Sequence, residues 1–141
     1  PAPARPLPDE IFALCDYLTP NETELEIITG MPVDTVEQAI TAARTLIAKG
    51  AKAVINKRGA AGSLLITADD ARMFPGFTVR AVDTTAAGDS FNAGFSIGIA
   101  REYAIEDAIK LGNAVGALST TKSGAQAAMP TQAEVDAFLA G

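Results

Sequence analysis

Residues 81–95 read Ala81-Val82-Asp83-Thr84-Thr85-Ala86-Ala87-Gly88-Asp89-Ser90-Phe91-Asn92-Ala93-Gly94-Phe95. Small residues and a glycine surround one carboxylate, Asp89, and an apolar segment with helical spacing follows at once. This order predicts a backbone loop that opens onto a helix N-terminus, where unpaired N–H groups and the positive end of the helix dipole attract phosphate. A carboxylate at such a position is either a helix cap or a base beside a phosphate, and the function of the segment depends on which.

Two interpretations of this segment follow from the residues alone. Spacing by itself favours the simpler one, in which Asp89 caps the helix, Gly88 makes a turn and Asp83 ends a strand. In the other, backbone N–H groups meet the charge of a transferred phosphoryl group, Asp89 accepts a proton from the attacking hydroxyl, and Asp83 helps to hold a cation. Neither the Gly-x-x-x-x-Gly-Lys-Ser/Thr phosphate loop nor the dinucleotide fingerprint is present.

Composition limits the classes of function. The 141 residues are 48% hydrophobic and 20% charged, which predicts one compact globular unit rather than a disordered chain. A net charge of −6 argues against a nucleic-acid surface but leaves nucleotide binding open. The chain has no histidine, which excludes a histidine base or metal ligand, and its single cysteine, Cys15, is expected to be a small buried hydrophobe. No apolar run approaches a membrane span and no signal peptide is visible, so we expect a cytoplasmic protein with no membrane partner.

The chain alternates predicted strands and helices. Residues 1–8 should be extended, 57–62 should form a flexible basic loop, and Asn21–Glu24 and Thr131–Glu134 have the spacing of capping boxes. Helices are predicted at about 9–16, 21–30, 35–49, 88–101, 105–120 and after 131, and strands at 17–19, 51–56, 63–67, 72–74 and 78–81. This alternation implies an α/β fold with a mostly parallel sheet covered by helices.

The stretch from Asp83 to Phe95 closely resembles the C-terminal signature of the ribokinase-like (PfkB) carbohydrate kinases, Asp-Thr-x-Gly/Ala-Ala-Gly-Asp-Ser/Thr-Phe-x-x-Gly. Other segments agree with the family in order and spacing over essentially the whole chain, and the ribokinases are the nearest group within it. These segments are Pro1-Ala2-Pro3-Ala4-Arg5 with Leu7-Pro8, Asn21-Glu22-Thr23-Glu24 as Asn-x-x-Glu, Gly59-Ala60-Ala61-Gly62 as Gly-x-x-Gly, and Lys122 to Gln126 with Pro130-Thr131. The resemblance implies a three-layer, Rossmann-like α/β fold, of which this chain is the C-terminal portion.

The resemblance also implies an ATP-dependent sugar kinase and assigns roles to individual residues. Asp89 would be the base that deprotonates the sugar hydroxyl, and Ala86, Ala87 and Gly88, with the Asp89 N–H, would form the anion hole. Glu24 would act on magnesium, through water. The nucleotide would be bound by Asn21, Lys57, Gly59, Gly62 and Asn113, and potassium by Asp83, Thr85, Thr120, Ser123 and Ala125.

Several of these positions have a plain structural alternative. Asn21 and Glu24 already make sense as a cap pair, and both interpretations can hold together. Gly59 and Gly62 could be turn residues, and Asn113 lies mid-helix and could face solvent. The sequence also departs from the ribokinase pattern, with Lys57 where a threonine is usual and Ala128 in place of a serine that helps to hold potassium.

Family members are considerably longer, because an N-terminal half carries the sugar motif, the lid and much of the sugar pocket. We therefore expect residues 1–141 to be the C-terminal, nucleotide-binding part of the kinase domain, unable to phosphorylate a sugar efficiently alone. An exposed apolar sheet edge would then favour self-association or a homodimer. Three alternatives stay open: a nucleotide-binding fragment without turnover, a kinase of another sugar or sugar acid such as fructose or 2-keto-3-deoxygluconate, and a kinase-like chain with a structural or regulatory role.

Overall fold

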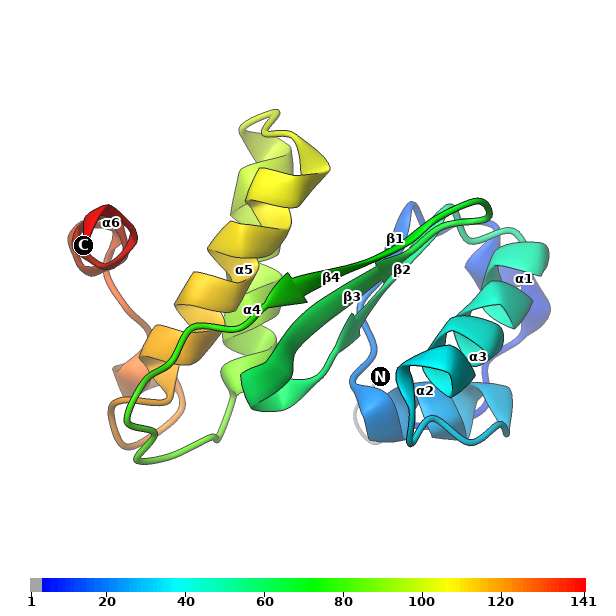
Figure 1. Cartoon of the computed structure of the whole chain (residues 1–141), viewed down its shortest axis with the longest axis horizontal. Coiled ribbons are helices and arrows are strands. Elements are labelled where there is room, and N and C mark those ends of the chain that lie inside the picture. The colour runs from blue at the N-terminus through cyan, green and yellow to red at the C-terminus, as the bar shows by residue number, and fades with distance from the viewer. Residues whose placement is uncertain (1–3) are drawn as a thin grey trace. The chain divides into compact units, whose positions relative to one another are not determined.

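Residues 4–141 are described in the computed structural model, and their helices and strands are drawn in Figure 1. The predicted extended segment 1–8 lies outside the described residues at positions 1–3, and residues 4–8 have no regular structure. The chain divides into two compact units, whereas its composition alone predicts one. The first holds the residues up to Gly59 together with Ser63–Met73, and the second holds Ala60–Gly62 and Phe74–Gly141. Each unit has its own packed helices, which is why the two separate.

Helices α1 (Asp9–Phe12), α2 (Glu22–Thr29) and α3 (Val36–Ala48) belong to the first unit. The predicted capping box begins α2, and that helix ends at the left-handed Gly30, as predicted. The predicted helix at 9–16 is too long, because the carbonyls of Cys15 and Asp16 accept hydrogen bonds from the N–H groups of Lys52 and Ala53, at the start of strand β2 (Ala53–Lys57). Those two residues therefore already run alongside that strand.

The sheet has the order β1 (Tyr17–Leu18), β2 (Ala53–Lys57), β3 (Gly62–Ile66) and β4 (Ala71–Pro75). Strand β1 is parallel to β2, but β2 is antiparallel to β3, so the sheet in this chain is mixed rather than mostly parallel. The reason is the short connection between β2 and β3, which is a single 3₁₀ turn at Gly59–Ala61 and cannot make a parallel crossover. The flexible basic loop predicted at 57–62 is therefore wrong, since its ends are strand residues and its middle is a turn.

The strand predicted at 78–81 does not form. Strand β4 is the last in the sheet order, so within residues 4–141 no neighbouring strand pairs with that segment. Alternating apolar residues only permit a strand, since the strand itself needs a partner for its N–H and C=O groups.

The core of the first unit lies between α3 and the sheet. Helix α3 buries Ala39, Ala42, Ala43 and Leu46 there, and the central strands contribute their apolar side chains to the same cluster. Its fully or nearly fully buried members include Ala39, Ala42, Ala43, Leu46, Val54, Leu64 and Ile66. This packing holds the strand ends at which the candidate residues of the first unit lie.

Helices α4 (Ala87–Ala100), α5 (Ile105–Ser119) and α6 (Gln132–Ala140) make up most of the second unit. Helices α4 and α5 run side by side, and glycines line their contact (Figure 1). A Cβ atom added to Gly98 would stand 2.8 Å from the Cα of Ala108, so the two backbones are too close for any side chain there. This close packing fixes α4, whose first turn carries Asp89.

Candidate active site

The first turn of α4 lacks any side-chain cap. Its N-cap residue is Ala86, which adopts the left-handed conformation with φ of 59°. Asp89 is the third residue of the helix and is exposed, and its carboxylate makes no hydrogen bond or ion pair with the rest of residues 4–141. The interpretation of Asp89 as a helix cap is therefore wrong. A left-handed alanine costs on the order of 1–2 kcal/mol, and such strain gathers at functional sites.

Some backbone N–H groups of this turn donate hydrogen bonds to the protein, and others do not. The Ser90 N–H donates to the Ala86 carbonyl at 2.9 Å and so starts the helical hydrogen bonding. The Ala87 N–H donates to the Thr84 carbonyl at 3.2 Å. Gly88 and Asp89 lie between these two donors, in the turn where helix geometry leaves N–H groups without an intrahelical acceptor. Among the predicted anion-hole donors, those of Gly88 and Asp89 thus suit an incoming phosphate best, and that of Ala87 is already used.

Asp83 links the segment before α4 to the loop around Gly124, both in the second unit, and this junction is called the Asp83 corner. Its carboxylate accepts the N–H of Thr85 and the N–H of Gly124, each at 2.9 Å. The Thr85 hydroxyl first, and then the Gly124 N–H, lower the pKa of Asp83 from 3.8 to about 2. Asp83 is therefore ionised at neutral pH and places a negative charge between the two segments.

The other predicted potassium residues lie around the same corner. The Thr120 carbonyl accepts the N–H of Val82 at 2.7 Å and that of Asp83 at 3.1 Å. Because a carbonyl oxygen has two lone pairs, Thr120 is already fully engaged. Ser123 and Ala125 are exposed and flank Gly124, so their carbonyls belong to the loop that meets Asp83.

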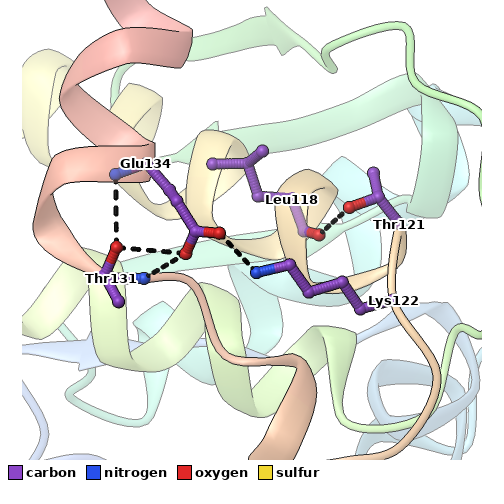
Figure 2. Close-up of polar contacts among 5 residues, drawn as sticks. All are labelled: Leu118, Thr121, Lys122, Thr131 and Glu134. Atoms are coloured by element: carbon purple, nitrogen blue, oxygen red, sulfur yellow. Dashed lines mark hydrogen bonds and ion pairs between the residues drawn. The ribbon is translucent and has the colours of Figure 1, made fainter.

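A hydrogen-bonded cluster ties this loop to the start of α6 (Figure 2). The Glu134 carboxylate accepts the Thr131 N–H at 2.8 Å and the Thr131 hydroxyl at 3.1 Å, and it forms an ion pair with Lys122. Lys122 first, and then Thr131, lower the pKa of Glu134 from 4.5 to about 2. The predicted capping box at Thr131 is confirmed, and its carboxylate also holds the loop through Lys122.

Four predicted ligands of the nucleotide and magnesium lie in the first unit, near the ends of β1 and β2. The Lys57 N–H donates to the Pro20 carbonyl at 2.9 Å, and Lys57 pairs with Asn21 in an isolated parallel bridge. Glu24 accepts the Asn21 N–H through its carboxylate at 2.7 Å, as the cap interpretation requires. Gly59 follows directly, in the turn that leaves β2.

Gly62 and Asn113 lie in the second unit, against the same stretch of backbone. A Cβ atom on Gly62, which has φ of 100°, would stand 2.1 Å from the Phe74 carbonyl oxygen. The Asn113 side chain is 7% exposed, and its amide donates to the carbonyls of Phe74 and Pro75, both at 3.4 Å. The suggestion that Asn113 faces solvent is wrong, because its amide is buried against the end of β4.

Sequence reasoning missed Arg58. Its side chain is only 10% exposed and binds Asn56 and Glu22 through separate nitrogens. A signal was present in the sequence, because Asn56 stands at the end of an apolar strand, and a buried amide needs a hydrogen-bonding partner.

The described residues contain no dense metal site and no candidate membrane span. Within residues 4–141, no three His, Cys, Asp or Glu side chains gather in a way that could hold a metal ion. Within the same residues, no helix combines the length and apolar character that crossing a bilayer requires.

The family described as "pfkB family carbohydrate kinase" matches residues 1–132 of this chain. The ribokinase of Haemophilus influenzae is 45% identical over 139 residues, which are 99% of this chain and 45% of that protein. The chain thus spans about half the length of the curated relatives it matches.

Solved structures show the same fold. The ribokinase of Thermotoga maritima superimposes with a TM-score of 0.91 and 42% identity, over 100% of this chain and 48% of that one. The ribokinase of Arabidopsis thaliana, solved in complex with ribose and ATP, gives a TM-score of 0.90 and 34% identity, over 95% of this chain and 44% of that one. The α/β, ribokinase-like fold expected from the sequence is therefore confirmed.

Proposed function

Because this chain belongs to the pfkB family of carbohydrate kinases, we propose that it supplies the ATP site, the anion hole and the catalytic base of an ATP-dependent sugar kinase. The observation that carries the proposal is the carboxylate of Asp89, which is exposed and does not cap the helix on which it stands. A carboxylate in the first turn of a helix that does not bond the N–H groups of that turn is free to act on a ligand. Its position also places the N–H donors for a phosphate beside it.

The proposed reaction transfers the terminal phosphoryl group of ATP to a sugar hydroxyl. Asp89 accepts the hydroxyl proton as the oxygen attacks phosphorus, and ADP leaves with the electrons of the broken P–O bond. The N–H groups of Gly88 and Asp89 meet the charge on the moving phosphoryl group, while the left-handed Ala86 and the engaged Ala87 hold the turn in place. Asn21, Lys57, Gly59, Gly62 and Asn113 would form or support the nucleotide site.

Magnesium would be held by Glu24. One oxygen of its carboxylate binds the Asn21 N–H, and the group remains a hard oxygen donor that can bind a hydrated cation through water. A putative ribokinase II from Escherichia coli, 28% identical and solved with ATP and Mg²⁺, supports the use of magnesium but does not bear on Glu24. Bound magnesium would neutralise charge on the phosphates.

Potassium would lie at the Asp83 corner. The ionised Asp83 and the carbonyls of Thr85, Ser123 and Ala125 supply the oxygen donors, and bound potassium would add positive charge near the anion hole. Thr120, whose carbonyl is saturated by two N–H donors, would instead hold Asp83 in place. A fructokinase double mutant from Vibrio cholerae solved with fructose, ADP and potassium supports a monovalent cation in this family.

Ribose or a closely related sugar is the proposed substrate. The supporting relatives are ribokinases and a deoxyribokinase from Salmonella typhimurium that is 41% identical over 140 residues. The departures at Lys57 and Ala128 keep fructose and 2-keto-3-deoxygluconate as alternatives. The sugar pocket itself would come from a part of the kinase that the described residues do not contain.

We further propose that residues 1–141 act as the C-terminal, nucleotide-binding part of the kinase domain in the cytoplasm. Without a sugar-binding part, the 141-residue chain should bind nucleotide but turn over little or no sugar. Tyr17, on the short edge strand β1, is 37% exposed, and Leu14 just before it is 85% exposed. This apolar edge should favour self-association, which sedimentation at increasing protein concentration would detect.

The test substitutes Asp89 by Asn in a kinase polypeptide that combines this chain with a sugar-binding part. We expect kcat to fall by about 10²–10⁴-fold, the range typical of a lost general base, with ATP affinity nearly unchanged. Asp107→Asn is the matched control, because Asp107 is also an exposed carboxylate at the third position of its helix, α5. Normal turnover by Asp89→Asn would refute the role of Asp89 as base. ATP binding without any turnover by the unsubstituted polypeptide would favour the binding-fragment alternative.

A further inference from the structure

Arg58 is a nearly buried cation beside the proposed nucleotide site of the first unit. Its side chain is 10% exposed, one guanidinium nitrogen lies 3.0 Å from a Glu22 carboxylate oxygen, and another donates to the Asn56 side-chain oxygen at 3.0 Å. An isolated buried charge is strongly unfavourable, so these two contacts are what make its burial tolerable.

The two partners of Arg58 belong to different elements. Glu22 is the first residue of α2 and directly follows the N-cap Asn21. Asn56 is completely buried in β2, and its amide donates to the Pro20 carbonyl at 3.3 Å. That same carbonyl accepts the Lys57 N–H. Arg58 therefore bridges the start of α2 and the end of β2.

The residues proposed to bind the nucleotide phosphates lie next to the residues of this bridge in the sequence. Asn21 lies one residue before Glu22, and Lys57 lies between Asn56 and Arg58. Gly59 is the next residue, with φ of 55°, and no atom lies within 4 Å of where its Cβ would be. Open space therefore borders Gly59 itself, whereas the far end of the turn is held by the Gly76 N–H, which donates to the Ala61 carbonyl at 3.2 Å.

Only an arginine satisfies both partners at once. Its planar fork places two N–H groups in fixed directions, whereas a lysine has one compact ammonium group. Loss of the fork would leave the Asn56 oxygen buried without this partner, which is the costly side of a broken hydrogen bond.

We infer that Arg58 is a positioning residue for the nucleotide site, one that fixes the N-terminus of α2 and the Lys57–Gly59 turn relative to each other through Glu22 and Asn56. The inference rests on the proposed function, because it assumes that Asn21, Lys57 and Gly59 bind the nucleotide. Arg58 itself need not touch the nucleotide, since both of its contacts are to protein.

Arg58→Met tests the inference in the 141-residue chain, because methionine keeps the apolar stem and removes the fork. Two quantities are measured: the Kd of Mg·ADP by calorimetry, and hydrogen exchange at the N–H groups of Lys57 and Gly59 without nucleotide. We expect Kd to rise about tenfold and both exchange rates to increase. Arg58→Lys should recover only part of each effect. The control is Arg44→Met, since Arg44 lies exposed on α3 and should change neither quantity.

The outcomes separate the inference from the proposed function. If the unsubstituted chain does not bind Mg·ADP, the proposed function fails and the inference fails with it. If that chain binds and Arg58→Met binds equally well, only the inference is overturned. If Arg58→Met does not fold, Glu22→Gln decides, because it removes the charge of the half-exposed partner and leaves the Arg58–Asn56 bond in place. An unchanged Kd and unchanged exchange in Glu22→Gln would then overturn the inference.

Discussion

Gly62→Ala should be far more destabilising than Gly59→Ala, although both glycines have positive φ and both belong to the Gly-x-x-Gly segment. The φ angles are 100° for Gly62 and 55° for Gly59. An alanine at either position must adopt a conformation that costs L-residues about 1–2 kcal/mol. For Gly59 this is the whole cost, because no atom lies within 4 Å of its added Cβ.

Gly62 has a second cost, from contacts with backbone. Its added Cβ would stand 2.1 Å from the Phe74 oxygen, 2.4 Å from the Gly76 nitrogen and 2.6 Å from the Pro75 carbonyl carbon. The first distance is more than about 1 Å short of van der Waals contact. Relief requires the backbone to move, which adds about 1–3 kcal/mol of overpacking. It would also weaken the Gly76 N–H bond to Ala61, now 3.2 Å, at about 1 kcal/mol.

The sum is about 3–6 kcal/mol for Gly62→Ala, against about 1–2 kcal/mol for Gly59→Ala. Urea unfolding followed by circular dichroism measures both, with the slope m compared to confirm that the unfolding reaction is the same. Equal destabilisation by the two variants would refute the reasoning from backbone contact. The result also decides between the two roles of Gly62, because a purely nucleotide-binding glycine would lose ATP affinity with little loss of stability.

Two further predictions concern acid stability and the helix pair. The pKa values of Asp83 and Glu134 fall to about 2 in the fold, from 3.8 and 4.5, so the unfolded chain binds more protons in that range. Stability should therefore hold from neutral pH down to about 4.5 and decline toward pH 2, and Glu134→Gln should flatten this decline in acid titrations of the urea midpoint. Gly98→Ala should lower the free energy of unfolding by up to about 2 kcal/mol, because its Cβ would meet the Ala108 backbone and the overpacking cost of about 1–3 kcal/mol exceeds the roughly 1 kcal/mol gain in helix propensity. A stabilised Gly98→Ala variant would contradict the close packing of α4 and α5.

Much of the local structure was predictable because its causes are local. The capping boxes at Asn21 and Thr131 need only two side chains three residues apart, and both form as predicted. The predicted end of the second helix at Gly30 is confirmed for the same reason, since a left-handed glycine ends a helix without help from distant residues. The strand predicted at 78–81 failed because its partner, unlike a cap, cannot be found in the neighbouring sequence.

Some features of the candidate site were likewise predictable from the local sequence, and others were not. The motif around Asp89 was recognisable because several residues in one short segment carry it. Three other features depend on contacts between segments. Asp89 does not cap its helix, the Thr120 carbonyl accepts the N–H groups of both Val82 and Asp83, and Asn113 is buried.

By itself, the sequence determined the family resemblance, the helix boundaries set by caps, and the residues able to carry the chemistry. Only the tertiary structure decided which of those residues remain free to act and which are already bound to protein. The physical reason is that a side chain's chemical type is written in the sequence, whereas its available lone pairs and N–H groups depend on partners far along the chain. Arg58 shows the difference most clearly, since a residue that reads as part of a basic loop is a nearly buried bridge between Glu22 and Asn56.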